Sequence, residues 1–210
     1  MEVISHRGLW YKQKEKNTLQ SFKKSFDNNF GLETDIRDMN KELVICHDLP
    51  DDSSMKLTQF FSFYKEYKEP FILALNIKAD GLQNELYRLI KKYEISNYFF
   101  FDMSVPDTIG YTKLNLKFFT RQSEYENHPS FYEECSGIWI DCFENIWYSE
   151  DLIKSYLRDG KKVVLVSSEL HKREHLTQWN FIKNWKIINN DNLILCTDLP
   201  EKAIKFFKNE

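Results

Sequence analysis

The sequence predicts an α/β fold with parallel strands, closed as a (β/α)₈ TIM barrel in a single domain. Short apolar segments alternate with longer amphipathic segments along the whole chain, which is the pattern of repeated strand–helix units. Eight of the short segments have the length of a strand, and eight strands close such a barrel. No linker or low-complexity tract divides the 210 residues, so we expect one domain over residues 1–210. An open, doubly wound sheet would give the same alternation.

The expected elements follow one another closely from the first residues to the last. Strands are expected at residues 3–5, 32–36, 71–76, 98–101, 117–120, 137–141, 162–166 and 193–196, where short apolar runs occur. Amphipathic helices are expected at residues 18–30, 58–67, 82–93, 106–112, 149–158, 173–185 and 200–208. A weaker helical segment covers residues 130–135. The helices of the fourth and fifth units are the shortest.

Charge and composition exclude several classes of partner. The formal net charge is −3, with both signs mixed, so nothing attracts the chain as a whole to nucleic acid or to an anionic membrane. The four cysteines show no C-x-x-C spacing, which argues against a zinc knuckle or a redox pair. No apolar run approaches the roughly 18 residues of a membrane helix. We expect a cytoplasmic protein without a membrane span; the oligomeric state stays open.

Polar residues gather at the ends of several predicted strands. In a parallel barrel the active site forms at the carboxyl ends of the strands, so these residues carry more weight than others. The segments concerned are Ser5-His6-Arg7-Gly8, Glu33-Thr34-Asp35, Cys46-His47-Asp48 and Asn76-Ile77-Lys78. Asp141, at the end of the sixth strand, is expected to line the substrate side of the same edge.

Glu33 and Asp35 are two residues apart, so on a strand their side chains project from the same face. Their negative charges repel each other unless a cation joins them. Mg²⁺ or Ca²⁺ prefers oxygen ligands, and Asn76 on the next strand could add an amide oxygen. Without a metal, the same pattern is two charges at a solvated strand end.

Two histidines and two cations complete the candidate site. His6 and His47 each follow an apolar run, and an imidazole can give or take a proton near neutral pH. Structural histidines or metal ligands would leave the same pattern. Arg7 and Lys78 could bind a phosphate and stabilise charge on its oxygens, although cations at strand ends are often only solvated or ion-paired.

Taken together, these motifs resemble the N-terminal signature of the glycerophosphodiester phosphodiesterase family. They occur in the family's order and spacing: His6-Arg7-Gly8, Lys16-Asn17-Thr18, Gly31-Leu32-Glu33-Thr34-Asp35 and His47-Asp48. The resemblance continues at Asn76-Ile77-Lys78 and returns at Thr197-Asp198-Leu199-Pro200. It is dense over residues 3–78 and thin over residues 79–190.

The resemblance implies a TIM barrel with metal-dependent phosphodiesterase activity. It implies the following roles: His6 and His47 as the acid–base pair, Arg7 and Lys78 as phosphate contacts, Glu33, Asp35 and Asn76 as ligands of Mg²⁺ or Ca²⁺, and Asn17 as a polar group beside the substrate. The expected partner is a small-molecule or headgroup phosphodiester, which would place the protein in lipid metabolism.

The sequence departs from the family pattern at three places. Lys16 stands where the family has Glu, and it adds positive charge near the site. Asn76 stands where the family has a third acidic ligand, so metal affinity should be lower. Only residues 49–56 lie between His47-Asp48 and the next predicted helix, whereas the family usually inserts a segment there that caps the glycerol group. The resulting open site favours a larger, lipid-linked or saccharide phosphodiester.

Two other functions fit the same residues. A phosphate-ester-binding barrel would keep Arg7 and Lys78 but lack turnover because of Asn76, although such a binder has no need of both histidines. A lyase would attack with the substrate's own hydroxyl and release a cyclic phosphate. Among the remaining residues, His171 and His175 are expected on the surface and Trp139 in the core. Glu169 is expected either to touch substrate or to be a solvated loop acid.

Overall fold

The computed structural model describes residues 1–67 and 70–208. These residues form two compact units: unit 1 comprises Met1–His6 and Phe119–Glu210, and unit 2 comprises Arg7–Phe118. All eight predicted strands are present in the described residues. The mixed α/β class with parallel strands is therefore confirmed. No helix within residues 1–67 and 70–208 is long and apolar enough to cross a bilayer.

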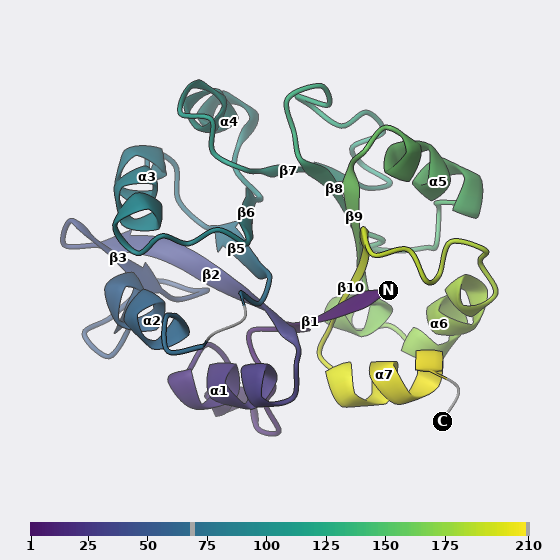
Figure 1. Ribbon diagram of the computed structural model, residues 1–210, viewed down its shortest axis with the longest axis horizontal. Helices are drawn as coiled ribbons and strands as arrows, with labels where there is room; N and C mark the ends of the chain where they lie inside the picture. Colours follow the sequence, from purple (N-terminus) through teal and green to yellow (C-terminus); the bar gives the residue numbers. More distant parts are fainter. Residues whose placement is uncertain (68–69, 209–210) are drawn as a thin grey trace. The chain divides into compact units, whose positions relative to one another are not determined.

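Unit 2 contains a sheet in the order β4-β3-β2-β5-β6. Its strands are β2 (Gly31–Met39), β3 (Glu42–Ile45), β4 (Met55–Lys56), β5 (Leu73–Ile77) and β6 (Tyr98–Phe101). Its helices are η1 (Gln13–Glu15), α1 (Leu19–Asp27), α2 (Leu57–Tyr64), α3 (Gln83–Lys92) and α4 (Val105–Lys113). The β2–β5 and β5–β6 pairs are parallel, as predicted. In Figure 1, α3 and α4 are drawn above the β2–β3 strands of this unit, and α1 and α2 are drawn below them.

The hairpin formed by β2 and β3 was not predicted as two strands. β2 continues past the expected end at residue 36 to Met39, turns at Asn40 and Lys41, and pairs antiparallel with β3. Asn40 and Lys41 have φ of 51° and 68°, as a tight two-residue hairpin turn requires. The return strand ends one residue before Cys46 and so positions His47.

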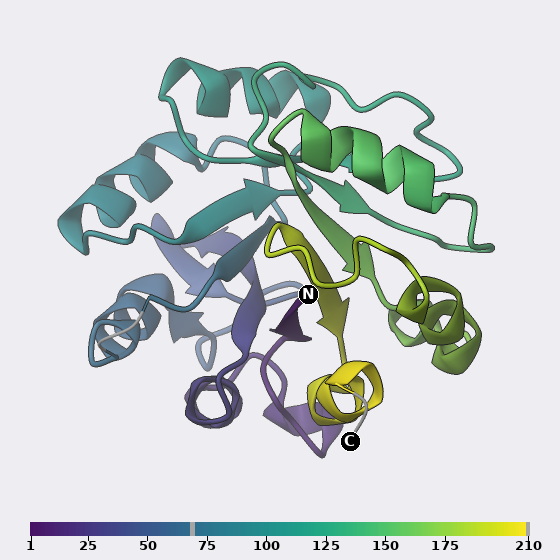
Figure 2. The same ribbon diagram turned by 45° about the vertical axis from the view of Figure 1, so that its right-hand side comes forward.

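Unit 1 contains a parallel sheet in the order β1-β10-β9-β8-β7. Its strands are β1 (Glu2–His6), β7 (Phe119–Gln122), β8 (Gly137–Ile140), β9 (Lys162–Val166) and β10 (Leu193–Thr197). Its helices are η2 (Ser168–His171), α5 (Glu150–Arg158), α6 (His175–Lys183) and α7 (Pro200–Lys208). Figure 2 shows the green and yellow helices beside the strands of this unit. The weak helical segment predicted at residues 130–135 was wrong, because these residues form turns.

Apolar residues in every strand explain why the sheets form. The β5, β6, β8 and β10 segments are buried at every position, as strands covered on both faces must be. In unit 2 the core is largely aromatic: the Phe22 and Phe60 rings lie 4.9 Å apart between α1 and α2. The Phe26 ring stacks on Phe71 at 4.9 Å, just before β5. Helices are thereby held against the strands whose ends carry the polar motifs.

Candidate active site

The acidic pair lies on β2 and is buried. Glu33 is 1% exposed and Asp35 is fully buried, and their spacing places both on one face of the strand. In the parallel β2–β5 ladder Asp35 is the register partner of Asn76, which is itself 7% exposed. The register therefore sets the Asn76 amide beside the Asp35 carboxylate, as the sequence pattern anticipated.

The segment after β1 wraps around these carboxylates. The backbone N–H of Arg7 donates to Glu33 Oε2 at 3.1 Å and to the Glu33 carbonyl at 2.9 Å. Arg7 Nε lies 2.8 Å from Asp35 Oδ2, as an ion pair rather than a well-aligned hydrogen bond. Asn17 Nδ2 donates to the same Oδ2 at 2.9 Å, and Asn17 Oδ1 accepts from Thr34 Oγ1 at 2.8 Å. Two buried negative charges thus have a cation and several donors around them.

Local backbone conformation and helix capping explain the residues of the His-Arg-Gly and Asn-Thr motifs. Arg7 and Asn17 both have positive φ, near 58° and 57°, and the Asn17 N–H closes the loop by donating to the Arg7 carbonyl at 3.0 Å. Gly8 has φ of 89°, and a Cβ there would lie 2.4 Å from Ser21 Oγ. Thr18 then caps α1 in a capping box with Ser21. The loop can take this course only with glycine at position 8.

Lys78 follows β5 and approaches the same carboxylate. Its Nζ lies 3.6 Å from Asp35 Oδ1 and 3.5 Å from Asp102 Oδ2. Asp102 follows β6 directly and was not predicted as part of the site. Because Asp35 is flanked by Arg7 and Lys78, a positive charge lies on each side of the buried carboxylate.

The oxygens around Asp35 suit a hard divalent cation. Asp35 Oδ1 and Asn76 Oδ1 are both buried and have no hydrogen-bond donor. With the Glu33 carboxylate they make a set of oxygen donors of the kind that Mg²⁺ and Ca²⁺ prefer. Within residues 1–67 and 70–208 no group of three or more His, Cys, Asp or Glu side chains could hold a metal ion. The third donor is therefore an amide, and the set has one charge fewer than three carboxylates.

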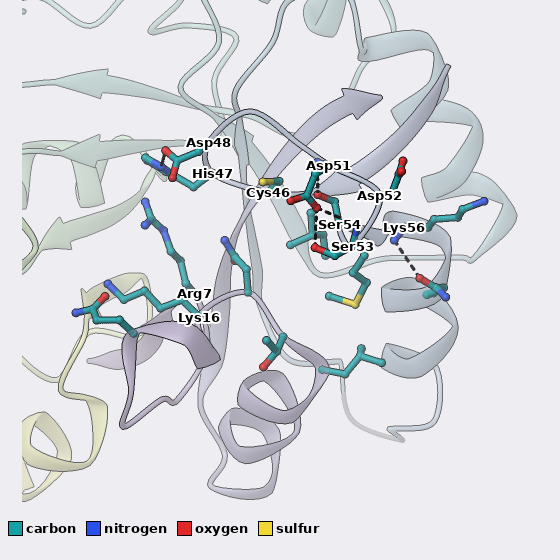
Figure 3. Close-up of a pocket in the computed structure, with 17 residues that line it drawn as sticks. Arg7, Lys16, Cys46, His47, Asp48, Asp51, Asp52, Ser53, Ser54 and Lys56 are labelled. Carbon is teal, nitrogen blue, oxygen red and sulfur yellow. Dashed lines mark hydrogen bonds and ion pairs between the residues drawn. The ribbon is translucent and has the colours of Figure 1, made fainter. Parts of the chain in front are cut away.

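His47 lies beyond β3 at the rim of a cavity of about 930 Å³. Its Nδ1 is 2.9 Å from Asp48 Oδ1, and this hydrogen bond lowers the pKa of the Asp48 carboxyl below its ordinary value. Arg7, Lys16 and Asn17 line the same cavity. In Figure 3 the Arg7 side chain extends toward His47 and Asp48, which face it from the other wall.

His6 has a different carboxylate partner, within unit 1. Its Nδ1 lies 2.7 Å from Asp198 Oδ1, and both side chains are mostly buried. Asp198 is held in turn because its backbone N–H donates to Glu169 Oε1 at 3.1 Å. Thr197 and Ser167 also donate their hydroxyls to the Glu169 carboxylate. Glu169 is therefore not a solvated loop acid, because its carboxylate holds Asp198, the partner of His6.

Asp141 also has a histidine partner, which corrects one expectation. His171 lies on η2 after β9, and its Nε2 is 3.0 Å from Asp141 Oδ1. Its side chain is only 18% exposed and packs against the Phe143 ring at 4.6 Å, so His171 is not a surface residue of an outer helix. Trp139 is buried in β8, as expected for the core.

Comparison with proteins of known structure identifies the fold. Searches of family models and of curated proteins found no match. A Galdieria sulphuraria protein, provisionally described as a glycerophosphodiester phosphodiesterase, has a TM-score of 0.75 at 17% identity, with 99% of this chain and 98% of that chain covered. The Agrobacterium tumefaciens enzyme gives 0.69 at 12% identity, with coverage of 99% and 97%. The Thermotoga maritima enzyme gives 0.61 at 14% identity, with 96% of each chain covered.

The chain has the glycerophosphodiester phosphodiesterase fold. The resemblance inferred from the N-terminal motifs is thus confirmed at the level of the fold, which these TIM-barrel neighbours share. The expected closure of the sheet is not observed, because no ladder between β6 and β7 occurs among the described residues. In a TIM barrel the carboxyl ends of the strands are the expected place for a site, and Asp35 on β2 is in register with Asn76, the next-to-last residue of β5. The agreement extends over the segment from residue 79 to residue 190, where the motifs are sparse.

Of the nine predicted site residues, six lie together around Asp35 in unit 2, His47 lines the cavity of the same unit, and the other two belong to unit 1. The group around Asp35 comprises Arg7, Asn17, Glu33, Asp35, Asn76 and Lys78. His6 and Asp141 have their own partners in unit 1. Sequence analysis missed the partner residues Asp198, Asp102 and His171. Only Asp198 had a signal, because it belongs to the Thr-Asp-Leu-Pro turn that resembles the family's closing strand.

Proposed function

We propose that this protein is a metal-dependent phosphodiesterase, a phosphoric diester hydrolase that acts on a glycerophosphodiester or on a larger lipid- or saccharide-linked phosphodiester. The observation that carries the proposal is the buried Glu33–Asp35 pair, flanked by the cations Arg7 and Lys78. The neighbouring folds whose descriptions name glycerophosphodiester phosphodiesterases support it. A cytoplasmic location and a role in lipid metabolism belong to the same proposal.

Glu33, Asp35 and Asn76 would hold one Mg²⁺ or Ca²⁺ ion. Support comes from the two buried oxygens, Asp35 Oδ1 and Asn76 Oδ1, that lack a hydrogen-bond donor. When bound, such an ion lowers the pKa of a hydroxyl or water and offsets the charge of the phosphate. Arg7 and Lys78 would bind the non-bridging phosphate oxygens, and their positive charge would stabilise the charge that develops there.

His6 and His47 would transfer the protons. Each has its Nδ1 bonded to a carboxylate, His6 to Asp198 and His47 to Asp48. A carboxylate bonded to Nδ1 orients the imidazole and stabilises its protonated form, which suits the ring to take a proton from the attacking oxygen or to give one to the leaving alcohol. His6 and Arg7 are consecutive in the chain, so an acid–base group directly precedes a phosphate contact.

One observation favours a second function, a phosphate-ester-binding barrel without turnover. Asn76 supplies an amide where a carboxylate would strengthen metal binding, and no cluster of three acidic or histidine ligands exists in the described residues. A binder of this kind would take up a phosphodiester through Arg7 and Lys78 and release it unchanged.

Turnover of a phosphodiester panel separates these functions. The protein should hydrolyse at least one member with Mg²⁺, Ca²⁺ or Mn²⁺ and none after chelation. His6→Ala and His47→Ala should each lower kcat by at least ~10²-fold, the lower range of general acid–base contributions, with unchanged circular dichroism. Rates like those of the wild type in either folded variant would exclude the assigned role. Product analysis by phosphorus NMR would detect the cyclic phosphate expected of a lyase.

A further inference from the structure

Three buried polar atoms outside the candidate active site have no hydrogen-bond partner within residues 1–67 and 70–208. They are Gln83 Oε1 at the start of α3 and, on α4, Asp107 Oδ2 and the Tyr111 hydroxyl. A buried polar atom that lacks a partner is costly, so native proteins satisfy nearly all such atoms with protein groups, water or ions. These three oxygens therefore need a ligand that the chain itself does not supply.

The three side chains lie at the contact between α3 and α4, which Figure 1 shows as neighbouring helices. Asp107 and Tyr111 are four residues apart and share a face of α4, and a long helical side chain points toward the N-terminal end. The Tyr111 ring is thereby directed toward the turn of Asp107. Gln83 covers Gly110 on the same face, because a Cβ at Gly110 would lie 2.6 Å from Gln83 Nε2. The Gly81 N–H donates to Asp107 Oδ1 at 2.9 Å and ties the two helices together.

The Asp107 carboxylate has no cation to offset its charge among the described residues. Its side chain is buried, with the residue 9% exposed, and Tyr111 is fully buried. Burial raises the pKa of the Asp107 carboxyl, the Asp80 charge raises it further, and only the Gly81 N–H lowers it. Buried charges in proteins are paired with an opposite charge or coordinate a metal ion. The contact between α3 and α4 thus combines an uncompensated negative charge with oxygen atoms that lack a partner.

We propose that Asp107, Gln83 and Tyr111 bind a monovalent alkali cation, Na⁺ or K⁺, between α3 and α4. One carboxylate and two neutral oxygens carry a single negative charge, which a monovalent ion balances. Protein oxygens replace the water shell of an alkali ion in the way that carbonyl oxygens do in ion-selective filters. The site is distinct from the acidic pair on β2, whose two carboxylates suit a divalent ion. A bound ion would hold together the segments that follow Lys78 and Asp102.

Thermal unfolding in different salts at one ionic strength tests this site without any turnover. The protein is first freed of divalent ions with a chelator. Its Tm is then compared in NaCl, KCl and tetramethylammonium chloride, whose cation is too large for the site and takes no oxygen ligands. An alkali ion at ten times its Kd should raise the Tm by roughly 3–6 °C, and the larger of the two effects identifies the ion. Asp107→Asn keeps the oxygen that accepts from Gly81 but removes the charge, so it should abolish the rise.

Two further variants make the test specific. Tyr111→Phe keeps the ring that packs against Phe100 at 5.4 Å and removes only the hydroxyl. It should lower the Tm in the salt of the bound ion but not in tetramethylammonium chloride, where it removes a buried hydroxyl without a partner. Asp151→Asn is the matched control and should keep the rise, because Asp151 also lies in the first turn of an α-helix but is exposed.

A rise in Tm that Asp107→Asn loses and Asp151→Asn keeps supports the inference, whether or not the protein hydrolyses a phosphodiester. Equal Tm values in the three salts overturn it, because a buried water in place of the ion would give that result. The same rise in Asp107→Asn and Asp151→Asn also overturns it, since the salts then act on the whole surface. An effect of Tyr111→Phe with one sign in every salt does so as well.

Discussion

At the scale of single residues, Asn76 controls the charge of the candidate metal site. Its amide oxygen is buried without a donor beside Asp35, at the position where a third carboxylate would add attraction for a cation. Coulombic attraction for a divalent ion falls when one anionic ligand is absent. The site is correspondingly more positive toward an anionic substrate, because the positive charge of Lys78, two residues after Asn76, is opposed by one carboxylate fewer.

We predict that metal and phosphodiester bind cooperatively, because the substrate supplies the missing anionic oxygens. Asn76→Glu should strengthen metal binding in the free protein and reduce the coupling. By linkage, the coupling must be equal whichever ligand is added first. Calorimetric titration of metal, with and without a non-hydrolysable phosphodiester analogue, measures both quantities.

Asn76→Gln is the matched control for that experiment. It lengthens the side chain by the same methylene group as Asn76→Glu but adds no charge. Metal affinity should therefore rise in the Glu variant only. Equal affinity in Asn76→Glu, Asn76→Gln and the wild type would mean that position 76 does not face the metal.

At the scale of elements, Glu169 joins three segments of unit 1. It lies on η2 after β9, and its carboxylate accepts hydrogen bonds from Ser167 at the end of β9 and from Thr197 and Asp198 at the end of β10. Asp198 then holds His6 at the end of β1. The position of His6 therefore depends on a residue that never contacts it.

We predict that Glu169→Gln lowers kcat between roughly 10- and 100-fold with little change in KM, because misplaced catalytic groups cost rate rather than binding. In an Asp198→Asn background the same change should have no further effect, since Glu169 acts through Asp198. Steady-state kinetics of the two single variants and the double variant measure this.

Glu174→Gln provides the comparison for a purely structural carboxylate. Glu174 caps α6 by accepting from the Leu176 and Thr177 N–H groups and has no link to His6. Its replacement should lower the Tm slightly, because the helix cap is weakened, and should leave kcat unchanged. Additive losses in the Glu169 and Asp198 double variant would show that Glu169 does not position His6.

Tyr64 links α2 to the chain that leads into β5. It is 4% exposed, its hydroxyl donates to the Phe71 carbonyl at 2.7 Å, and burial raises its pKa to about 12. A pKa that is higher in the folded than in the unfolded protein favours folding below pH 10, the unfolded value. That contribution is lost as the pH rises from 10 through 12.

We predict that Tyr64→Phe lowers the free energy of unfolding by about 1 kcal/mol at pH 8, because the hydrogen bond is lost. The difference from the wild type should shrink at pH 11. At that pH the tyrosine ionises in the unfolded protein but stays neutral in the folded one, which lowers the stability of the wild type and not that of the variant. Urea denaturation at the two pH values checks this. A difference that is independent of pH would mean that Tyr64 ionises equally well in both states.

At the scale of the whole molecule, the proposed metal site would couple metal binding to folding. Glu33 and Asp35 are buried like charges that lie close together on β2, so an ion bound only by the native state would stabilise it by mass action. We predict that Mg²⁺ or Ca²⁺ at 100 times its Kd raises the free energy of unfolding by about 2.7 kcal/mol.

Differential scanning calorimetry, with metal and with a chelator, measures that shift through the Tm. Glu33→Gln removes one carboxylate with little change in volume and should abolish most of the shift. Glu42→Gln serves as the control, because Glu42 is an exposed acid at the start of β3. An equal shift in Glu33→Gln and the wild type would place the ion elsewhere.

The sequence by itself determined the strands and the main carboxylate pair. Apolar runs marked all eight parallel strands, and β6 and β9 begin and end where they were predicted, because a buried strand needs apolar side chains along its own length. The period of two along a strand placed Glu33 and Asp35 on one face for the same local reason. Gly8 is likewise required locally, because its positive φ and its close approach to Ser21 exclude a side chain.

Only the tertiary structure decided which distant residues meet. The β2–β5 register sets Asn76 beside Asp35, and Asp198 reaches His6 from 192 positions along the chain. His171 was expected on the surface. It contacts Asp141 instead, because the segment directly after β9 is η2, which precedes α6. Register and loop course depend on packing between segments far apart in sequence, so no local pattern encodes them. The barrel strands were thus predictable from their own residues, whereas the partners of the histidines were not.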